Sequence, residues 1–80
     1  MGTVTAKLRK IVGRNIRAQR LKLGFSQEML AVKCGMHDNY ISKVELSKIS
    51  IGIDNLERVA RALKINPKLL LDDDPSHLGA

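Results

Sequence analysis

The chain has 80 residues and a mass of 8.9 kDa, which leaves room for one domain and little room for a catalytic cleft. Its single cysteine excludes an intramolecular disulfide, and no apolar run is long enough to span a membrane. The net charge is +6, and without the acidic run 72–74 the other 77 residues, with 14 basic and five acidic side chains, carry +9. Charge of this sign favours a polyanionic partner, either nucleic acid or an anionic membrane.

Location and cofactors can also be predicted from composition. Cys34 as the only cysteine fits a reducing compartment, and no apolar stretch near the N-terminus resembles a signal peptide, so we expect a cytoplasmic protein. Cys34 and His37 are spaced like metal ligands, but two ligands are too few for a site. Because no nucleophile–base pair or phosphate-binding loop is visible either, we expect no metal, no cofactor and no enzymatic activity.

The first predicted helix covers residues 5–23. At 100° per residue its apolar side chains fall on one side, namely Leu8, Val12, Ile16 and Leu23. Basic side chains fall on the opposite side, namely Lys7, Lys10, Arg14 and Arg17. This basic stripe is either a solvated face or a surface that flanks the backbone of a bound nucleic acid. Gly24 is suited to end the helix.

Four shorter helices are expected after it. One runs from Ser26, a capping residue, to Gly35, and the next covers residues 37–46. Asp54 is a candidate cap for a fourth helix, and Asn66 followed by Pro67 predicts a fifth. Residues 49–53 alternate in polarity, but we interpret them as a loop because no partner strand exists. The predicted domain covers residues 1–71, and an acidic, flexible tail covers residues 72–80.

The second and third helices have the spacing of a helix-turn-helix. Ala31 provides the small residue that a close helix crossing needs, Gly35 allows a positive φ in the turn, and Ile41 faces Ala31 from the next helix. The other inward positions are apolar: Leu30, Cys34, Met36 and Val44. The outward residues of the third helix are polar and suit insertion into a major groove: His37, Asp38, Asn39, Ser42 and Lys43.

With these positions the sequence resembles the Cro/lambda-repressor-type (XRE) helix-turn-helix family. The segments that carry the resemblance are Ile16-Arg17-Ala18-Gln19-Arg20, Gly24-Phe25-Ser26-Gln27-Glu28-Met29-Leu30-Ala31, Gly35, Tyr40-Ile41-Ser42-Lys43-Val44-Glu45 and Leu56-Glu57-Arg58-Val59-Ala60-Arg61-Ala62-Leu63. The resemblance implies an all-α, compact five-helix lambda-repressor-like DNA-binding domain, which binds operator DNA as a homodimer. The short chain and the Tyr40-Ile41-Ser42 start of the recognition helix resemble restriction–modification controller proteins. Ser47 and Ile51 depart from the Gly and Pro common in relatives.

Residues of the recognition region have distinct expected roles. In the family the residue matching Gln27 donates to a DNA phosphate, and the helix N-terminus there also attracts an anion. Asn39 can pair with adenine, Lys43 with guanine and Asp38 with cytosine, although Asp38 can instead repel wrong sequences. His37 is expected near phosphates or as a helix cap. Tyr40 either packs in the core or, as in controller-like relatives, lies against the DNA. The remaining predicted DNA contacts are Ser42, Lys48 and Arg17.

Arg20 and Glu45 are expected to form a structural ion pair. Arg20 lies at the edge of the apolar face of its helix, and Glu45 lies near a helix end where the dipole disfavours an acid. A pair between the matching positions in the family explains both placements. The alternative is two solvated charges.

These observations predict a sequence-specific transcriptional regulator that binds double-stranded operator DNA. The alternative is a protein-interaction module, such as an antitoxin or adaptor, on the same fold. A homodimer is expected because Ile49, Ile51, Ile53 and residues 69–71 supply more apolar surface than one small domain needs. A near-palindromic operator would follow from its two-fold symmetry. We expect autoregulation by concentration, without a small-molecule effector and without membrane binding.

Overall fold

A computed structural model of the protein describes residues 2–74, with side chains described from residue 7 onward. Its helices are α1 (Gly2–Lys22), α2 (Gln27–Cys34), α3 (Asp38–Glu45), α4 (Ile53–Ala62) and the 3₁₀ helix η1 (Pro67–Leu71). The all-α prediction is confirmed. Residues 49–52 form a loop as expected, but Ile53, which we predicted as part of that loop, is the first residue of α4. None of the helices in residues 2–74 is long and apolar enough to cross a membrane.

The helix boundaries differ from the sequence prediction by up to three residues, the largest difference being that α1 begins at Gly2 instead of residue 5, and the last two helices also differ in type or cap. The fifth helix is a 3₁₀ helix of five residues, which is the form that short helical segments commonly take. Asn66 caps it, as its side chain accepts from the backbone amide of Lys68 at 3.0 Å. Asp54 is not the cap of α4: Gly52 is the N-cap, and Asp54 lies in the first turn, where an acid still complements the helix dipole.

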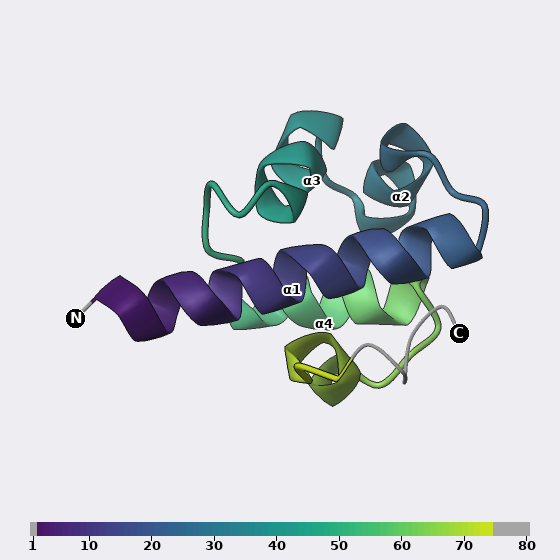
Figure 1. Ribbon diagram of the computed structural model, residues 1–80. Helices are drawn as coiled ribbons and strands as arrows, with labels where there is room; N and C mark the ends of the chain where they lie inside the picture. Colours follow the sequence, from purple (N-terminus) through teal and green to yellow (C-terminus); the bar gives the residue numbers. More distant parts are fainter. Residues whose placement is uncertain (1, 75–80) are drawn as a thin grey trace.

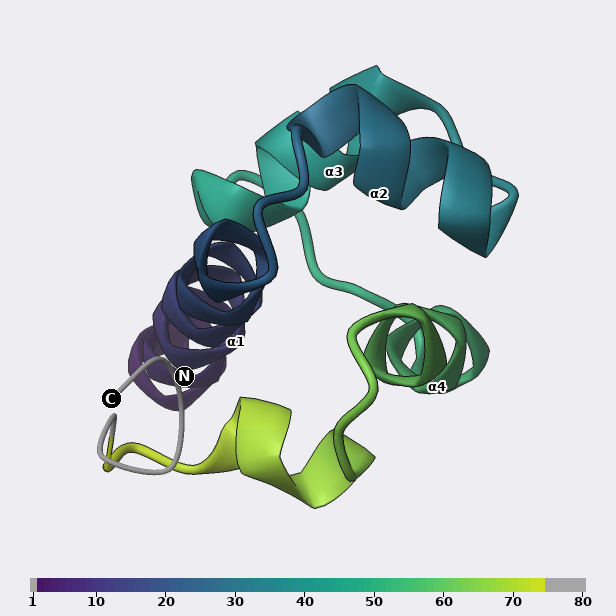
Figure 2. The same cartoon turned by 90° about the vertical axis from the view of Figure 1, so that its right-hand side faces the viewer.

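In the view of Figure 1 the long helix α1 runs across the middle of the picture. The helices α2 and α3 lie together on one side of it, while α4 and η1 lie on the other. Viewed along the axis of α1, the helices surround a common interior, with α1 and α4 on opposite flanks (Figure 2). The recognition region is therefore presented on a face remote from η1.

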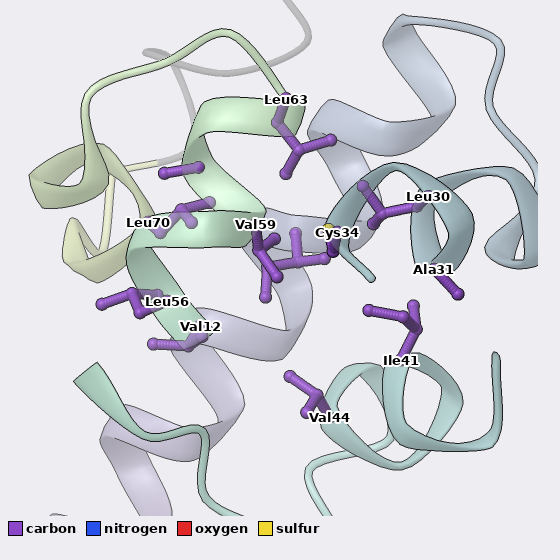
Figure 3. Packing of buried hydrophobic residues seen from close by; sticks show 12 residues of the cluster. Val12, Leu30, Ala31, Cys34, Ile41, Val44, Leu56, Val59, Leu63 and Leu70 are labelled. Carbon is purple, nitrogen blue, oxygen red and sulfur yellow. The ribbon is translucent and has the colours of Figure 1, made fainter. Parts of the chain in front are cut away.

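The interior is aliphatic. Side chains from all five helices converge in it, as Figure 3 shows for ten labelled residues. Ile16, Val59, Leu63 and Leu70 are fully buried. The predicted apolar face of α1 is only partly right, because Leu8 remains 47% exposed while Ile11 is buried.

Two buried amides of α1 hold the C-terminal part of the chain. Asn15 Nδ2 donates to the carbonyl oxygens of Leu70 at 3.0 Å and Asp72 at 2.7 Å, and Gln19 Nε2 donates to the carbonyl of Leu63 at 3.2 Å. These carbonyls lie at or just beyond helix ends, where intrahelical donors are missing. Asparagine and glutamine therefore occupy positions in α1 that the apolar periodicity did not identify.

The start of the predicted tail also contacts α1. Arg14 Nη2 donates to the carbonyl oxygen of Asp73 at 2.9 Å, and its Nη1 lies 3.4 Å from the carboxylate of the same residue. Residues 75–80 of the predicted tail lie outside the described residues. Contacts with α1 thus continue past residue 71.

Gly13 allows α1 and α3 to approach closely. A Cβ atom at this position would lie 2.5 Å from the carbonyl oxygen of Val44 and 2.9 Å from that of Glu45. Real Cβ atoms essentially never come so close to backbone oxygens. A glycine is therefore required where the C-terminal turn of α3 rests on α1.

Candidate nucleic-acid interface

The turn between α2 and α3 follows the predicted helix-turn-helix geometry. The side chain of Ser26 accepts from the amide of Met29 at 3.0 Å and caps α2. Gly35 has φ +71°, and the amide of Met36 donates to the carbonyl of Ala31 at 2.8 Å, which closes the end of the helix. Ala31 and Ile41 are both buried, so that the two helices pack closely at the predicted crossing.

The outer face of α3 is polar and open to solvent. His37, Asp38, Asn39 and Lys43 are exposed, and Ser42 is half-buried. His37 is the N-cap residue by position but makes no side-chain capping bond. Of the two roles expected for His37, its side chain therefore does not fill the capping one, and the start of α3 presents three neighbouring polar side chains.

Arg20, Glu45 and Gln27 form one hydrogen-bonded network beneath this face. Arg20 Nε donates to Glu45 Oε2 at 2.7 Å and its Nη2 to Oε1 at 3.0 Å, a bidentate geometry. The side chains are 8% and 2% exposed, so this is a buried pair and not two solvated charges. Arg20 Nη1 also donates to the carbonyl of Phe25 at 2.9 Å, which ties the loop before α2 to α1.

Gln27 is linked to the same carboxylate. Its Nε2 donates to Glu45 Oε1 at 3.1 Å, and the side chain is half-buried. An amide nitrogen carries two hydrogens, so that one remains for an acceptor outside the protein. The network therefore fixes the orientation of Gln27 at the N-terminus of α2.

The loop after α3 begins with a strained residue. Ser47 has φ +63°, in the left-handed region that glycine adopts at no cost. The amide of Ser47 donates to the carbonyl of Val44 at 3.0 Å, and that of Lys48 donates to the carbonyl of Lys43 at 2.9 Å. Glycine would adopt this conformation without strain, and the turn leaves Lys48 exposed next to the end of α3.

The basic stripe of α1 is divided between two surroundings. Arg17 is exposed and lies one turn after Gly13, the residue on which the end of α3 rests. Arg14 instead pairs with Asp73, which follows η1 in the chain. Arg17 therefore lies close to the recognition region, whereas Arg14 does not.

Tyr40 fills the packing role, one of the two roles that the sequence left open for it. Its ring packs against the apolar core, but the residue is only half-buried. Its hydroxyl oxygen accepts a hydrogen bond from Asn55 Nδ2 at 3.1 Å. Sequence reasoning did not single out Asn55, because an asparagine in the first turn of a helix has no pattern that points to a partner in another helix.

Cys34 belongs to the core. It is 6% exposed, and burial raises the pKa of its thiol above the ordinary value, while Arg58 opposes this shift. Within residues 2–74, His, Cys, Asp and Glu side chains form no group of three that could hold a metal ion.

Comparison with known proteins identifies the family. A helix-turn-helix family model matches residues 16–70. The chain therefore belongs to the XRE-type helix-turn-helix family, and it is a DNA-binding transcription regulator by class. The predicted resemblance to this family is confirmed.

Individual relatives include proteins named as controllers. The chain is 40% identical over 70 residues to control protein C.BamHI of Bacillus amyloliquefaciens, covering 86% of each chain. The structure is similar to that of the hypothetical transcription factor NHTF from Neisseria, with a TM-score of 0.82, 36% identity and coverage of 88% of this chain and 80% of the other. It is also similar to the restriction-modification controller protein C.AhdI from Aeromonas hydrophila, with a TM-score of 0.75, 32% identity and coverage of 78% and 94%.

Proposed function

We propose that the protein binds a near-palindromic operator as a homodimer and thereby regulates transcription, including the transcription of its own gene. The observation that carries this proposal is the exposed polar face of α3, held on α1 by a glycine contact and a buried ion pair. A rigid, polar helix of this size fits a major groove. An apolar outer face, as a protein-binding module would need, is not what α3 presents.

The polar side chains divide into base readers and phosphate anchors. Asn39 and Lys43 are exposed on α3 and have the donors that adenine and guanine edges require, and Asp38 beside them selects against wrong bases or accepts from cytosine. The anchors lie on α3 or on the segments around it and are proposed to contact phosphates on either side of the groove: Gln27, His37, Ser42, Lys48 and Arg17.

An apolar patch on another face supports the homodimer. Ile53 is 84% exposed, and Leu71 and Leu8 are about half-exposed. With Ile49 and Ile51 they line a hollow of about 250 Å³. Leu70, which the sequence predicts as part of this surface, is instead fully buried in the core. Burial of exposed aliphatic side chains against a second copy removes them from water and supplements the core of a small domain.

Control by concentration follows from dimerisation. If only the dimer occupies both half-sites, DNA occupancy rises steeply with total protein. Similarity to proteins named as controllers supports this mode of regulation. We propose no small-molecule effector, because the hollow at Ile53 is assigned to the partner subunit.

Base reading is tested by comparing the affinities for a selected operator and for random duplex DNA across a salt series. Asn39→Ala should weaken operator binding by about 1–3 kcal/mol and leave random-duplex binding nearly unchanged. Arg17→Ala should weaken binding to both duplexes and reduce the slope of log affinity against log salt concentration by about one released counterion. Lys68→Ala is the matched control, since Lys68 is exposed on η1, away from α3. An equal loss of both affinities in Asn39→Ala would contradict base reading by α3.

The dimer is tested by sedimentation of two charge-introducing variants. Ile53→Lys should give a monomer at micromolar concentration, since it places an unpaired charge in the apolar patch. Val32→Lys is the control: Val32 is 75% exposed on α2, outside the patch. A wild-type protein that sediments as a monomer with and without DNA would refute the homodimer.

A further inference from the structure

A side-chain hydrogen bond joins the first turn of α3 to the first turn of α4. Asn55 Nδ2 donates to the hydroxyl oxygen of Tyr40 at 3.1 Å, and both residues are half-buried. The ring of Tyr40 is already held by the apolar core. Since a tyrosine side chain has only two χ angles, packing and this one bond together fix the position of its oxygen.

The direction of this bond determines where the hydroxyl hydrogen can go. A phenol hydroxyl has one hydrogen to donate, and its oxygen also accepts. Because the amide of Asn55 can only donate through its nitrogen, the hydrogen of Tyr40 points away from Asn55. No hydrogen bond in the described part of the chain uses that hydrogen. Tyr40 directly follows Asp38 and Asn39, the exposed residues of the first turn of α3.

We propose that Asn55 is a positioning residue for DNA binding, which directs the hydroxyl hydrogen of Tyr40 toward a phosphate oxygen of the operator. This inference rests on the proposed function and extends it to a residue outside the helix-turn-helix. A phosphate is the acceptor because phosphate oxygens flank a helix in the major groove and accept strong, charge-assisted bonds. Since tyrosine is neutral, the contact adds affinity without releasing a counterion.

The test reverses the direction of the Asn55–Tyr40 bond. In Asn55→Asp the carboxylate can only accept, so the hydroxyl hydrogen turns to it and is lost to the DNA. An acid in the first turn of α4 is compatible with the helix dipole, so the fold should be retained. The same change in a Tyr40→Phe background measures the effect of the added charge alone. Asn66→Asp is a second charge control, since Asn66 is exposed beside η1 and caps it through an oxygen that aspartate retains.

Operator affinities of the four combinations, measured by fluorescence anisotropy, should show coupling between the two residues. Tyr40→Phe should lower affinity about tenfold with an unchanged salt slope. Asn55→Asp should lower affinity about tenfold more in the wild-type background than in Tyr40→Phe. If Asn55→Asp unfolds the protein, Asn55→Ala replaces it in both backgrounds. Asn55→Ala should then lower operator affinity only in the background that has the Tyr40 hydroxyl, and by a smaller factor than Asn55→Asp.

Three results would overturn the inference. The first is a Tyr40→Phe variant that binds the operator as tightly as the wild type, and the second is an Asn55 change that acts by the same factor in both backgrounds. In either case the wild-type protein would still bind its operator, so the proposed function would stand. Failure of the wild-type protein to bind any duplex would instead refute the proposed function, and this inference with it.

Discussion

Glu45→Gln should destabilise the protein far more than its small chemical change suggests. The substitution keeps the volume of the side chain but removes the charge that faces Arg20 at 2.7 Å. Arg20 is 8% exposed at its side chain, so its guanidinium is left charged, buried and without a counter-ion. Loss of one partner of a buried pair costs about 3–5 kcal/mol, which is large for an 80-residue domain with a total stability of roughly 4–12 kcal/mol.

Thermal and urea unfolding at one fixed protein concentration measure this effect. A loss of 3 kcal/mol should lower the melting temperature by at least about 12 °C in a domain of this size. Glu57→Gln is the matched control, because Glu57 lies 3.8 Å from Arg61 and both side chains are largely exposed. That variant should lose less than about 1 kcal/mol.

A double variant separates the loss of an attraction from the cost of an unpaired charge. Arg20→Met combined with Glu45→Gln removes both charges, and it should be more stable than Glu45→Gln alone. The reasoning fails if Glu45→Gln is no more destabilising than Glu57→Gln. It also fails if the two changes in the double variant add without coupling.

Three further outcomes are expected from contacts elsewhere in the fold. Gly13→Ala should lower the free energy of unfolding in urea by about 1–3 kcal/mol, because the added Cβ would meet the carbonyl of Val44. Alanine normally stabilises a helix interior, so a gain in stability would contradict this contact. Asn15→Leu should lower the free energy of unfolding by about 1–3 kcal/mol, because the carbonyls of Leu70 and Asp72 lose their donor. Amide hydrogen exchange in η1 should become faster, and an unchanged exchange rate would contradict this role of Asn15. Burial raises the pKa of Cys34, so the folded state retains its proton longer than the unfolded state, and wild-type stability should fall relative to Cys34→Ala as the pH rises above about 8.5. Parallel pH profiles for the two proteins would refute this last expectation.

The helix-turn-helix could be predicted because its constraints are local. The small Ala31, the positive φ of Gly35 and the inward Ile41 follow from spacings within eleven residues, and the structure has all three as expected. Ser26 as the cap of α2 is also a local property, since its hydroxyl reaches an amide three residues away. Such features depend on helix geometry alone, which is the same in every fold.

Contacts between distant segments could not be predicted in the same way. Asn15 and Gln19 lie among the apolar positions of α1, and their use depends on carbonyls more than 40 residues away. Gly13 appears in the sequence as an ordinary helical glycine, and only the position of α3 shows why no side chain fits. The pairing of Arg20 with Glu45 could be predicted because the family resemblance supplied the long-range information that helical periodicity lacks.

In the proposed dimer, the first turn of α4 connects DNA reading to subunit pairing. Ile53, the most exposed residue of the apolar patch, and Asn55, the donor to Tyr40, lie two positions apart in that turn. The loop between α3 and α4 is longer and contains the strained Ser47, so it is a less rigid connection than a helical turn. The distance from the two-fold axis to each α3 is then set by this connection through α4 together with the contacts that hold α3 on α1, and it determines the separation of the operator half-sites.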